Sequence, residues 1–204
     1  MNKKWTITLG LATVAGFAAS VVVAGVGGGP HDFTSEAWNE SGEKCLPCHI
    51  PHGAMTQIAG ETIEFLWNHA VPDSGDFTVH SGADLGAESL VCLGCHDGQT
   101  ALDSFGGVTG TTVMTGTEVI GTDLMDDHAV GVEYGTSTRR AAVGTIWGGQ
   151  PAVVVGFGGL PLFGTDNKIE CATCHTPHDV GTGNFLRVNN AASGLCVACH
   201  TAHE

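Results

Sequence analysis

The chain has 204 residues, of which 21 are acidic, 7 are Lys or Arg and 11 are His, giving a formal net charge of −14. Such an acidic chain is a poor partner for nucleic acid or an anionic membrane surface, both of which attract basic proteins. Gly contributes 31 residues and aromatic residues only 6 %. This composition favours loops and close backbone approach over a large aromatic core.

The first 24 residues have the pattern of an export signal. Two lysines near the N-terminus precede a mostly apolar run, and Val22-Val23-Ala24 before Gly25 resembles a cleavage site. A retained membrane anchor is the alternative, because the run approaches spanning length. We favour cleavage after Ala24, which predicts an exported domain of residues 25–204 without membrane insertion.

Every cysteine belongs to one of four copies of Cys-x-x-Cys-His, the attachment signature of c-type haem. In such a motif the two thiols form thioethers with the porphyrin and the His binds iron, and one helical turn brings all three side chains to one face. The predicted attachment residues are Cys45, Cys48, Cys92, Cys95, Cys171, Cys174, Cys196 and Cys199, and the predicted proximal iron ligands are His49, His96, His175 and His200. The sequence therefore predicts four covalently bound haems.

Two other interpretations of these cysteines and histidines explain less of the pattern. A disulfide framework suits an exported chain with an even number of cysteines, but it does not explain a His after every second Cys. Structural zinc also takes Cys and His ligands, but the four pairs are far apart and each His directly follows its Cys.

Seven further histidines are available as distal ligands, whereas methionine is scarce. Ligation of each iron by two histidines is the economical prediction, and it implies lower potentials than His/Met ligation. His52 and His178 each lie three residues after a proximal His, on the same helical face. They cannot reach the opposite side of the same iron, so we expect each to bind the iron of a neighbouring haem.

Three more histidines are candidates for distal ligation. His69 lies close to Trp67, and His128 follows two aspartates that could orient a ligating imidazole. His31 lies near the predicted new N-terminus and could bind a haem of its own chain or of a neighbouring subunit. His80 and His203 rank behind these.

The motifs occur in two pairs, which suggests one tetrahaem domain built from a di-haem module at 25–100, a Gly/Val/Thr-rich insert at 101–168 and a second di-haem module at 169–204. Within the insert, Thr111–Ile120 and Ala152–Phe157 have the composition of short strands. So short a chain cannot wrap four haems separately, so the haems must replace much of the core. The predicted fold is mostly irregular and loop-rich, with short helices at the haem motifs and a few short strands.

The paired motifs, with Pro-His after the first and the third, resemble exported multihaem cytochromes with doubled haem motifs. The motif count, size and spare histidines are similar to those of OmcE-like subunits of extracellular cytochrome nanowires. That resemblance implies head-to-tail subunits, a continuous chain of haems and one iron ligated by a His of the adjacent subunit, for which His31 is the candidate by position. The Gly/Val-rich insert carries no such resemblance.

These observations predict an electron-transfer protein, not an enzyme, in which electrons hop between packed bis-histidine haems. The main hypothesis is an extracellular filament subunit whose partners are other copies of itself, together with redox proteins or extracellular acceptors. A soluble or membrane-anchored periplasmic electron carrier is the alternative. A multihaem reductase would need an open coordination site, against which the surplus of histidines argues.

Overall fold

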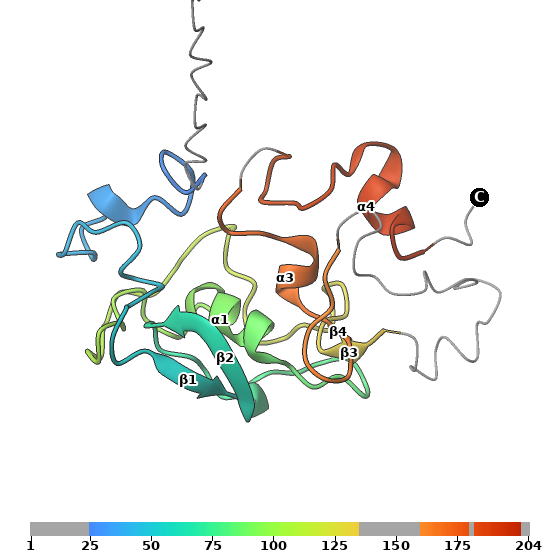
Figure 1. Ribbon diagram of the computed structural model, residues 1–204, viewed down its shortest axis with the longest axis horizontal. Coiled ribbons are helices and arrows are strands. Elements are labelled where there is room, and N and C mark those ends of the chain that lie inside the picture. Colours follow the sequence, from blue (N-terminus) through green and yellow to red (C-terminus); the bar gives the residue numbers. More distant parts are fainter. Residues whose placement is uncertain (1–24, 135–159, 180–181, 201–204) are drawn as a thin grey trace, which may run out of the picture.

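The computed structural model describes residues 25–134, 160–179 and 182–200 (Figure 1). Within these ranges, short helices and strands are separated by long irregular segments, as the composition predicts. The predicted signal at 1–24 and the predicted strand Ala152–Phe157 lie outside the described residues. In the part of the chain that is described, no helix combines the length and the apolar character needed to cross a membrane.

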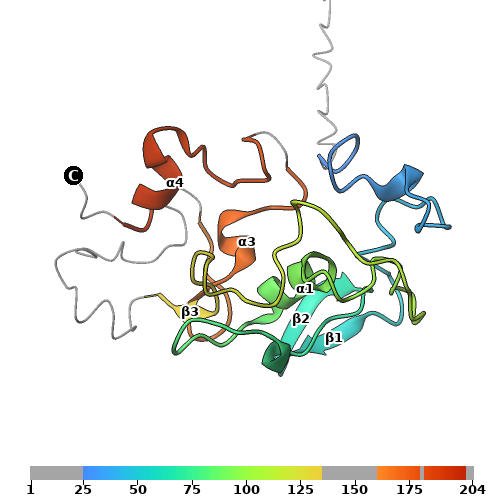
Figure 2. The same ribbon diagram turned by 180° about the vertical axis from the view of Figure 1, so that it is seen from behind.

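A hairpin and a helix form the first hydrophobic core. Strands β1 (Met55–Ile58) and β2 (Glu61–Trp67) pair antiparallel, with Ile58 opposite Glu61. Ala59 and Gly60 connect them with φ angles of 50° and 80°, the left-handed conformation that tight hairpin turns require. Alternate side chains of β2 are buried and pack with helix α1 (Ala87–His96), which the hairpin adjoins in Figures 1 and 2. This core includes Ile58, Ile63, Trp67, Phe77, Leu85, Leu90, Leu93 and Leu124.

Helix α1 carries the second Cys-x-x-Cys-His motif and fits tightly into its surroundings. Leu90 and Leu93 are buried, and a Cβ added at Gly94 would lie 2.7 Å from the carbonyl oxygen of Ala70. Glycine is therefore required at this position for the helix to approach the chain after β2. The close packing fixes the position of the motif.

A second, smaller core lies at the C-terminal motifs. Strands β3 (Val132–Glu133) and β4 (Lys168–Ile169) pair antiparallel. Tyr134, Leu160 and Ile169 are buried there, and Leu195 packs against them. Helix α3 (Cys171–Cys174) holds the third motif and α4 (Gly194–Val197) the start of the fourth. Among the described residues, the remaining short elements are three 3-10 helices: η1 (Phe33–Ser35), η2 (Ser74–Asp76) and η3 (Ala191–Ser193).

The two predicted di-haem modules are in direct contact, because α3 packs against α1. Figure 1 shows α3 beside α1 and away from the hairpin. The third motif therefore packs against the helix that carries the second motif, although the insert separates the two motifs in the sequence.

The predicted strand at Thr111–Ile120 is wrong. Only Val113 forms an isolated bridge, with Ala101. The carboxylate of Asp103 accepts hydrogen bonds from the Thr111 and Thr112 N–H groups at 2.9 and 2.8 Å. These two N–H groups therefore do not pair with a neighbouring strand. Gly116, with φ of 107°, then turns the chain.

Candidate functional site

Each Cys-x-x-Cys-His motif forms a helical turn. The second lies within α1. In the others, the His N–H bonds to the carbonyl oxygen of the first Cys, at 2.8 Å for His49, 3.0 Å for His175 and 2.8 Å for His200. This turn places both sulfurs and the imidazole on one side of the backbone, as attachment to a single macrocycle requires.

The imidazoles of three motif histidines are fixed by backbone carbonyls. A ring N–H donated to a carbonyl selects one tautomer and leaves Nε2 unprotonated for a metal. The Nδ1 atoms of His49, His96 and His175 lie 2.6, 2.8 and 2.8 Å from the carbonyl oxygens of Phe65, Glu118 and Asn184, respectively. In these three motifs Nε2 is therefore the nitrogen that is available to a metal.

Three motif histidines also face a second histidine from a distant part of the chain. The ring centres are 5.9 Å apart for His49 and His178, 6.3 Å for His96 and His31, and 6.2 Å for His200 and His128. The structure thus brings together three of the predicted distal candidates with three different motifs.

These separations fit a metal between the rings. A metal bound by two imidazoles lies about 2 Å from each nitrogen, which places the ring centres about 6 Å apart. Rings that cannot share a metal also reach this separation, as Phe65 and Trp67 do at 6.0 Å, so the assignment depends on both members of each pair being imidazoles as well as on the distance. The donor set and its spacing therefore suit bis-histidine haem iron.

His31 is held from several sides. Its ring stacks on Phe185 and hydrogen bonds to the backbone of Pro177 in the segment after the third motif. Burial, and secondarily the nearby charge of His96, lowers the pKa of His31 and favours the neutral imidazole that a metal binds.

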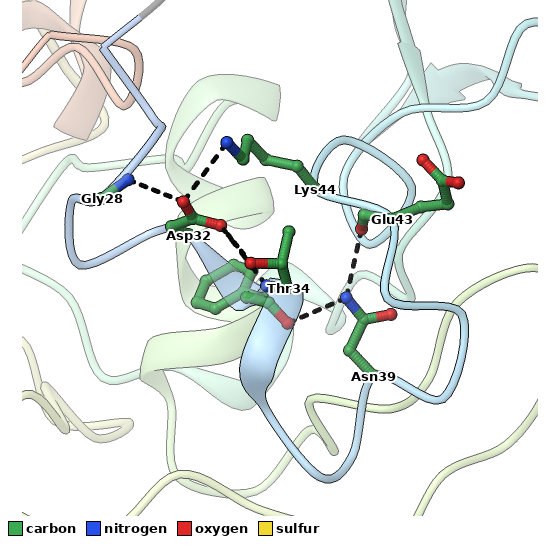
Figure 3. Close-up of polar contacts among 7 residues, drawn as sticks. Gly28, Asp32, Thr34, Asn39, Glu43 and Lys44 are labelled. Atoms are coloured by element: carbon green, nitrogen blue, oxygen red, sulfur yellow. Dashed lines mark hydrogen bonds and ion pairs between the residues drawn. The ribbon is translucent and has the colours of Figure 1, made fainter.

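The segment carrying His31 is a folded arm stabilised by polar contacts (Figure 3). The Asp32 carboxylate accepts hydrogen bonds from Gly28 N–H at 2.6 Å and Thr34 Oγ1 at 2.8 Å, and forms an ion pair with Lys44 at 3.3 Å. Asn39, which is buried, donates to the carbonyls of Phe33 and Glu43. The arm therefore has a defined conformation next to α1.

The other two facing histidines differ in their surroundings. Burial, followed by the charge of His49, lowers the pKa of His178. His128 is exposed, and its Nδ1 lies 3.1 Å from the carbonyl oxygen of Ala129. In both cases the histidine lies in a different part of the sequence from the motif histidine next to it.

Two predicted distal ligands are not brought opposite a motif histidine within the described residues. His52 is exposed on the loop after the first motif. His69 is only 1 % exposed, with Nδ1 2.8 Å from the Ala70 carbonyl oxygen and Nε2 3.2 Å from that of Leu102. Of the weaker candidates, His80 contacts the Asp127 carbonyl at 3.1 Å, and His203 lies outside the described residues.

The attachment cysteines of different motifs lie close to one another. Helix α3, which begins at Cys171, packs against α1, which contains Cys92, and interaction with Cys92 lowers the pKa of Cys171. Cys48 packs against the first core, which includes Leu90 and Leu93 of α1, and Cys199 packs against the second core, which includes Ile169. Burial is the main reason that the pKa is raised to about 12 for Cys95 and to about 11 for Cys174. Motif three therefore adjoins motifs two and four, and motif one adjoins motif two.

Sequence reasoning missed the groups that orient these residues. The carbonyls of Phe65, Glu118 and Asn184 are backbone atoms, and no side-chain pattern reveals them. Glu170, a buried carboxylate directly before the third motif, was also missed. An acidic residue next to Cys171 was a visible signal, but its burial depends on α1.

The C-terminal part of the chain matches a known family model. Residues 165–204 match the model described as the doubled CXXCH motif. A comparison with curated proteins gave no match. The match supports a multihaem c-type cytochrome-like protein, with CXXCH motifs that indicate covalently bound c-type haem and haem-based electron transfer. Cytochromes of this kind are typically exported.

Proposed function

We propose that this chain is an exported tetrahaem c-type cytochrome that transfers single electrons between closely packed bis-histidine haems and has no catalytic site of its own. The observation that carries this proposal is the set of three facing imidazole pairs, 5.9 to 6.3 Å apart. Each pair joins a motif histidine to a spare histidine from another part of the chain, as distal ligation requires.

The residues divide into three roles. The eight cysteines hold the porphyrins covalently, and His49, His96, His175 and His200 bind the irons on the proximal side. His178, His31 and His128 bind the irons of motifs one, two and four on the distal side. When bound, haem supplies the one-electron redox chemistry, whereas the chain fixes the spacing, orients the imidazoles and limits access of water.

For the iron of motif three, whose proximal ligand is His175, four histidines are candidates for the distal position. His52 and His69 remain candidates from the sequence, together with His80 and His203. The repeat relates His52 to His178, since both follow a proximal His by three residues.

The first test is the haem count and spin state. Pyridine haemochrome absorbance with intact-mass measurement should give four covalent haems per chain, and electron paramagnetic resonance should show low-spin bis-histidine iron. Fewer than four haems, or a dominant high-spin signal in the native protein, would contradict the tetrahaem bis-histidine assignment.

Assembly into an extracellular filament is the further part of this proposal. The resemblance in motif count and pairing to nanowire subunits supports it, and a head-to-tail contact that does not close would produce a filament. Negative-stain electron microscopy of the exported protein should show filaments with the haem spectrum. Dispersed particles with the same spectrum would exclude the filament.

A discrete periplasmic carrier, soluble or membrane-anchored, is the second candidate. One observation favours it: His31, the predicted donor to a neighbouring subunit, faces His96 of its own chain at 6.3 Å. A monomer that retains four low-spin haems after dilution would support the carrier, and loss of one low-spin haem on dilution would support a shared ligand.

A further inference from the structure

A buried carboxylate lies between the second and third motifs. Glu170 is 1 % exposed and directly precedes Cys171, the first cysteine of motif three. Its Oε1 accepts a hydrogen bond from Gly86 N–H at 3.0 Å, at the start of α1. The helix end offers unpaired N–H groups and a partial positive charge, both of which favour an anion. Gly86 has no side chain to cap α1, so Glu170 acts as the cap.

Ser89 completes the link between the two helices. Its hydroxyl donates to Oε2 of Glu170 and accepts from Cys171 N–H at 3.0 Å. Ser89 is fully buried in α1, three residues before Cys92. The Cys92 thiol donates to the Glu88 carbonyl of the same helix at 3.4 Å. Through Ser89, the network therefore joins the carboxylate to the backbone of Cys171 in motif three and to the turn of α1 that precedes Cys92 in motif two.

From this network we propose that Glu170 is the positioning residue that holds the second and third haem-attachment segments side by side and thereby sets the geometry between their haems. The inference rests on the proposed function and adds a residue that is neither a thioether anchor nor an iron ligand. Glu170 acts through Gly86 and Ser89 on α1, and through its own chain connection on α3.

The charge around Glu170 provides a readout that a purely steric role would lack. Burial raises the pKa of Glu170 to about 7, with the charge of Glu88 acting in the same direction and the hydrogen bonds from Ser89 and Gly86 and the charge of Lys168 opposing it. Its carboxyl group therefore changes protonation near neutral pH. The titratable groups that face this network are Glu61, Asp84, Glu88, Cys92, Lys168 and Cys171.

The test compares three variants of the full, haem-loaded protein. E170A removes the acceptor of both bonds to α1, whereas E170Q keeps a carbonyl oxygen for Gly86 and an amide that reaches the Ser89 hydroxyl. E61A is the matched control, because the Glu61 carboxylate binds the next N–H of the same helix start, Ala87 N–H at 3.2 Å, and does not contact the cysteine pair.

The primary measurement is Soret circular dichroism, whose bisignate component reports the relative orientation of neighbouring haems. We expect the couplet to be reduced in E170A and retained in E170Q and E61A, with the haem count unchanged. A wild-type couplet in E170A would overturn the proposal. If E170A does not accumulate with a full haem complement, the pH profile of the potentials in E170Q, described next, decides the question.

The second measurement is the pH profile of the haem midpoint potentials. Reduction adds an electron near Glu170, so we expect wild-type potentials to fall as pH rises from about 6 to 8, and to fall less steeply in E170Q than in E61A. Equal slopes in E170Q and wild type would overturn the placement of Glu170 beside the haem pair. Absence of haem from the wild-type protein would instead refute the proposed function.

Discussion

The imidazole of His31 lies 6.3 Å from that of His96, centre to centre, although the two residues belong to the N-terminal arm and to the end of α1. The contact depends on three parts of the chain: the folded arm, the helix, and the segment after motif three that supplies Phe185 and Pro177. The proposed second haem site is therefore built from residues spread along most of the chain.

Removal of the His31 imidazole should leave one haem without its distal ligand. In H31A, we expect about a quarter of the haem to become high-spin, one site of the proposed four. Electron paramagnetic resonance and the long-wavelength charge-transfer absorption of the ferric protein would measure this. T34A is the control, because Thr34 lies in the same arm as His31 and its side chain bonds Asp32 but carries no imidazole. Equal low-spin content in H31A and wild type would exclude His31 as an axial ligand.

The repeat provides a matched pair of variants for the first haem. His52 and His178 occupy equivalent positions in the sequence, but the structure places His178 5.9 Å from His49 and leaves His52 exposed. We expect H178A to convert the haem of motif one to a high-spin state. H52A should leave that haem low-spin, and any change it causes should concern another site. The same spectral change at one haem in both variants would show that they share an iron.

The Cys-x-x-Cys-His motifs could be recognised in the sequence because each lies within one helical turn. Which histidines would lie next to one another could not be predicted, because this depends on contacts between distant segments, such as His128 with His200. His52 and His178 show the limit clearly: the same local sequence lies in two different tertiary environments. The loop-rich fold followed from composition, whereas the predicted strand at Thr111–Ile120 failed because Asp103 binds its backbone N–H groups.

Gly94 should not tolerate a methyl group, even though alanine is the better helix former. Glycine to alanine in a helix normally stabilises by up to about 1 kcal/mol. Here the new Cβ would lie 2.7 Å from the Ala70 carbonyl oxygen and 3.4 Å from Nδ1 of His69. We expect G94A to lower the free energy of unfolding by about 1 to 3 kcal/mol, the usual cost of overpacking.

Denaturant unfolding followed by far-ultraviolet circular dichroism would measure this cost. G82A is a useful comparison, because Gly82 has a φ of 81° and no atom within 4 Å of the added Cβ. It tests backbone strain without a collision. If G94A were as stable as wild type, α1 would have to sit farther from Ala70 than the structure shows.

The buried carboxylate of Glu170 makes stability dependent on pH. Its pKa is about 7 in the folded chain and close to 4.5 for an ordinary glutamate. Because the folded protein binds this proton more tightly, the stabilisation is complete below about pH 4.5 and is lost as pH rises through about 7. The shift corresponds to about 3 kcal/mol between these limits.

Unfolding free energies from guanidinium titrations at about pH 5 and about pH 8 should therefore differ by this order in wild type and much less in E170Q. E61Q, which alters the neighbouring carboxylate at the same helix start, should keep the wild-type difference. A pH dependence in E170Q equal to that of wild type would mean that another group carries it, and that Glu170 is ionised throughout the range.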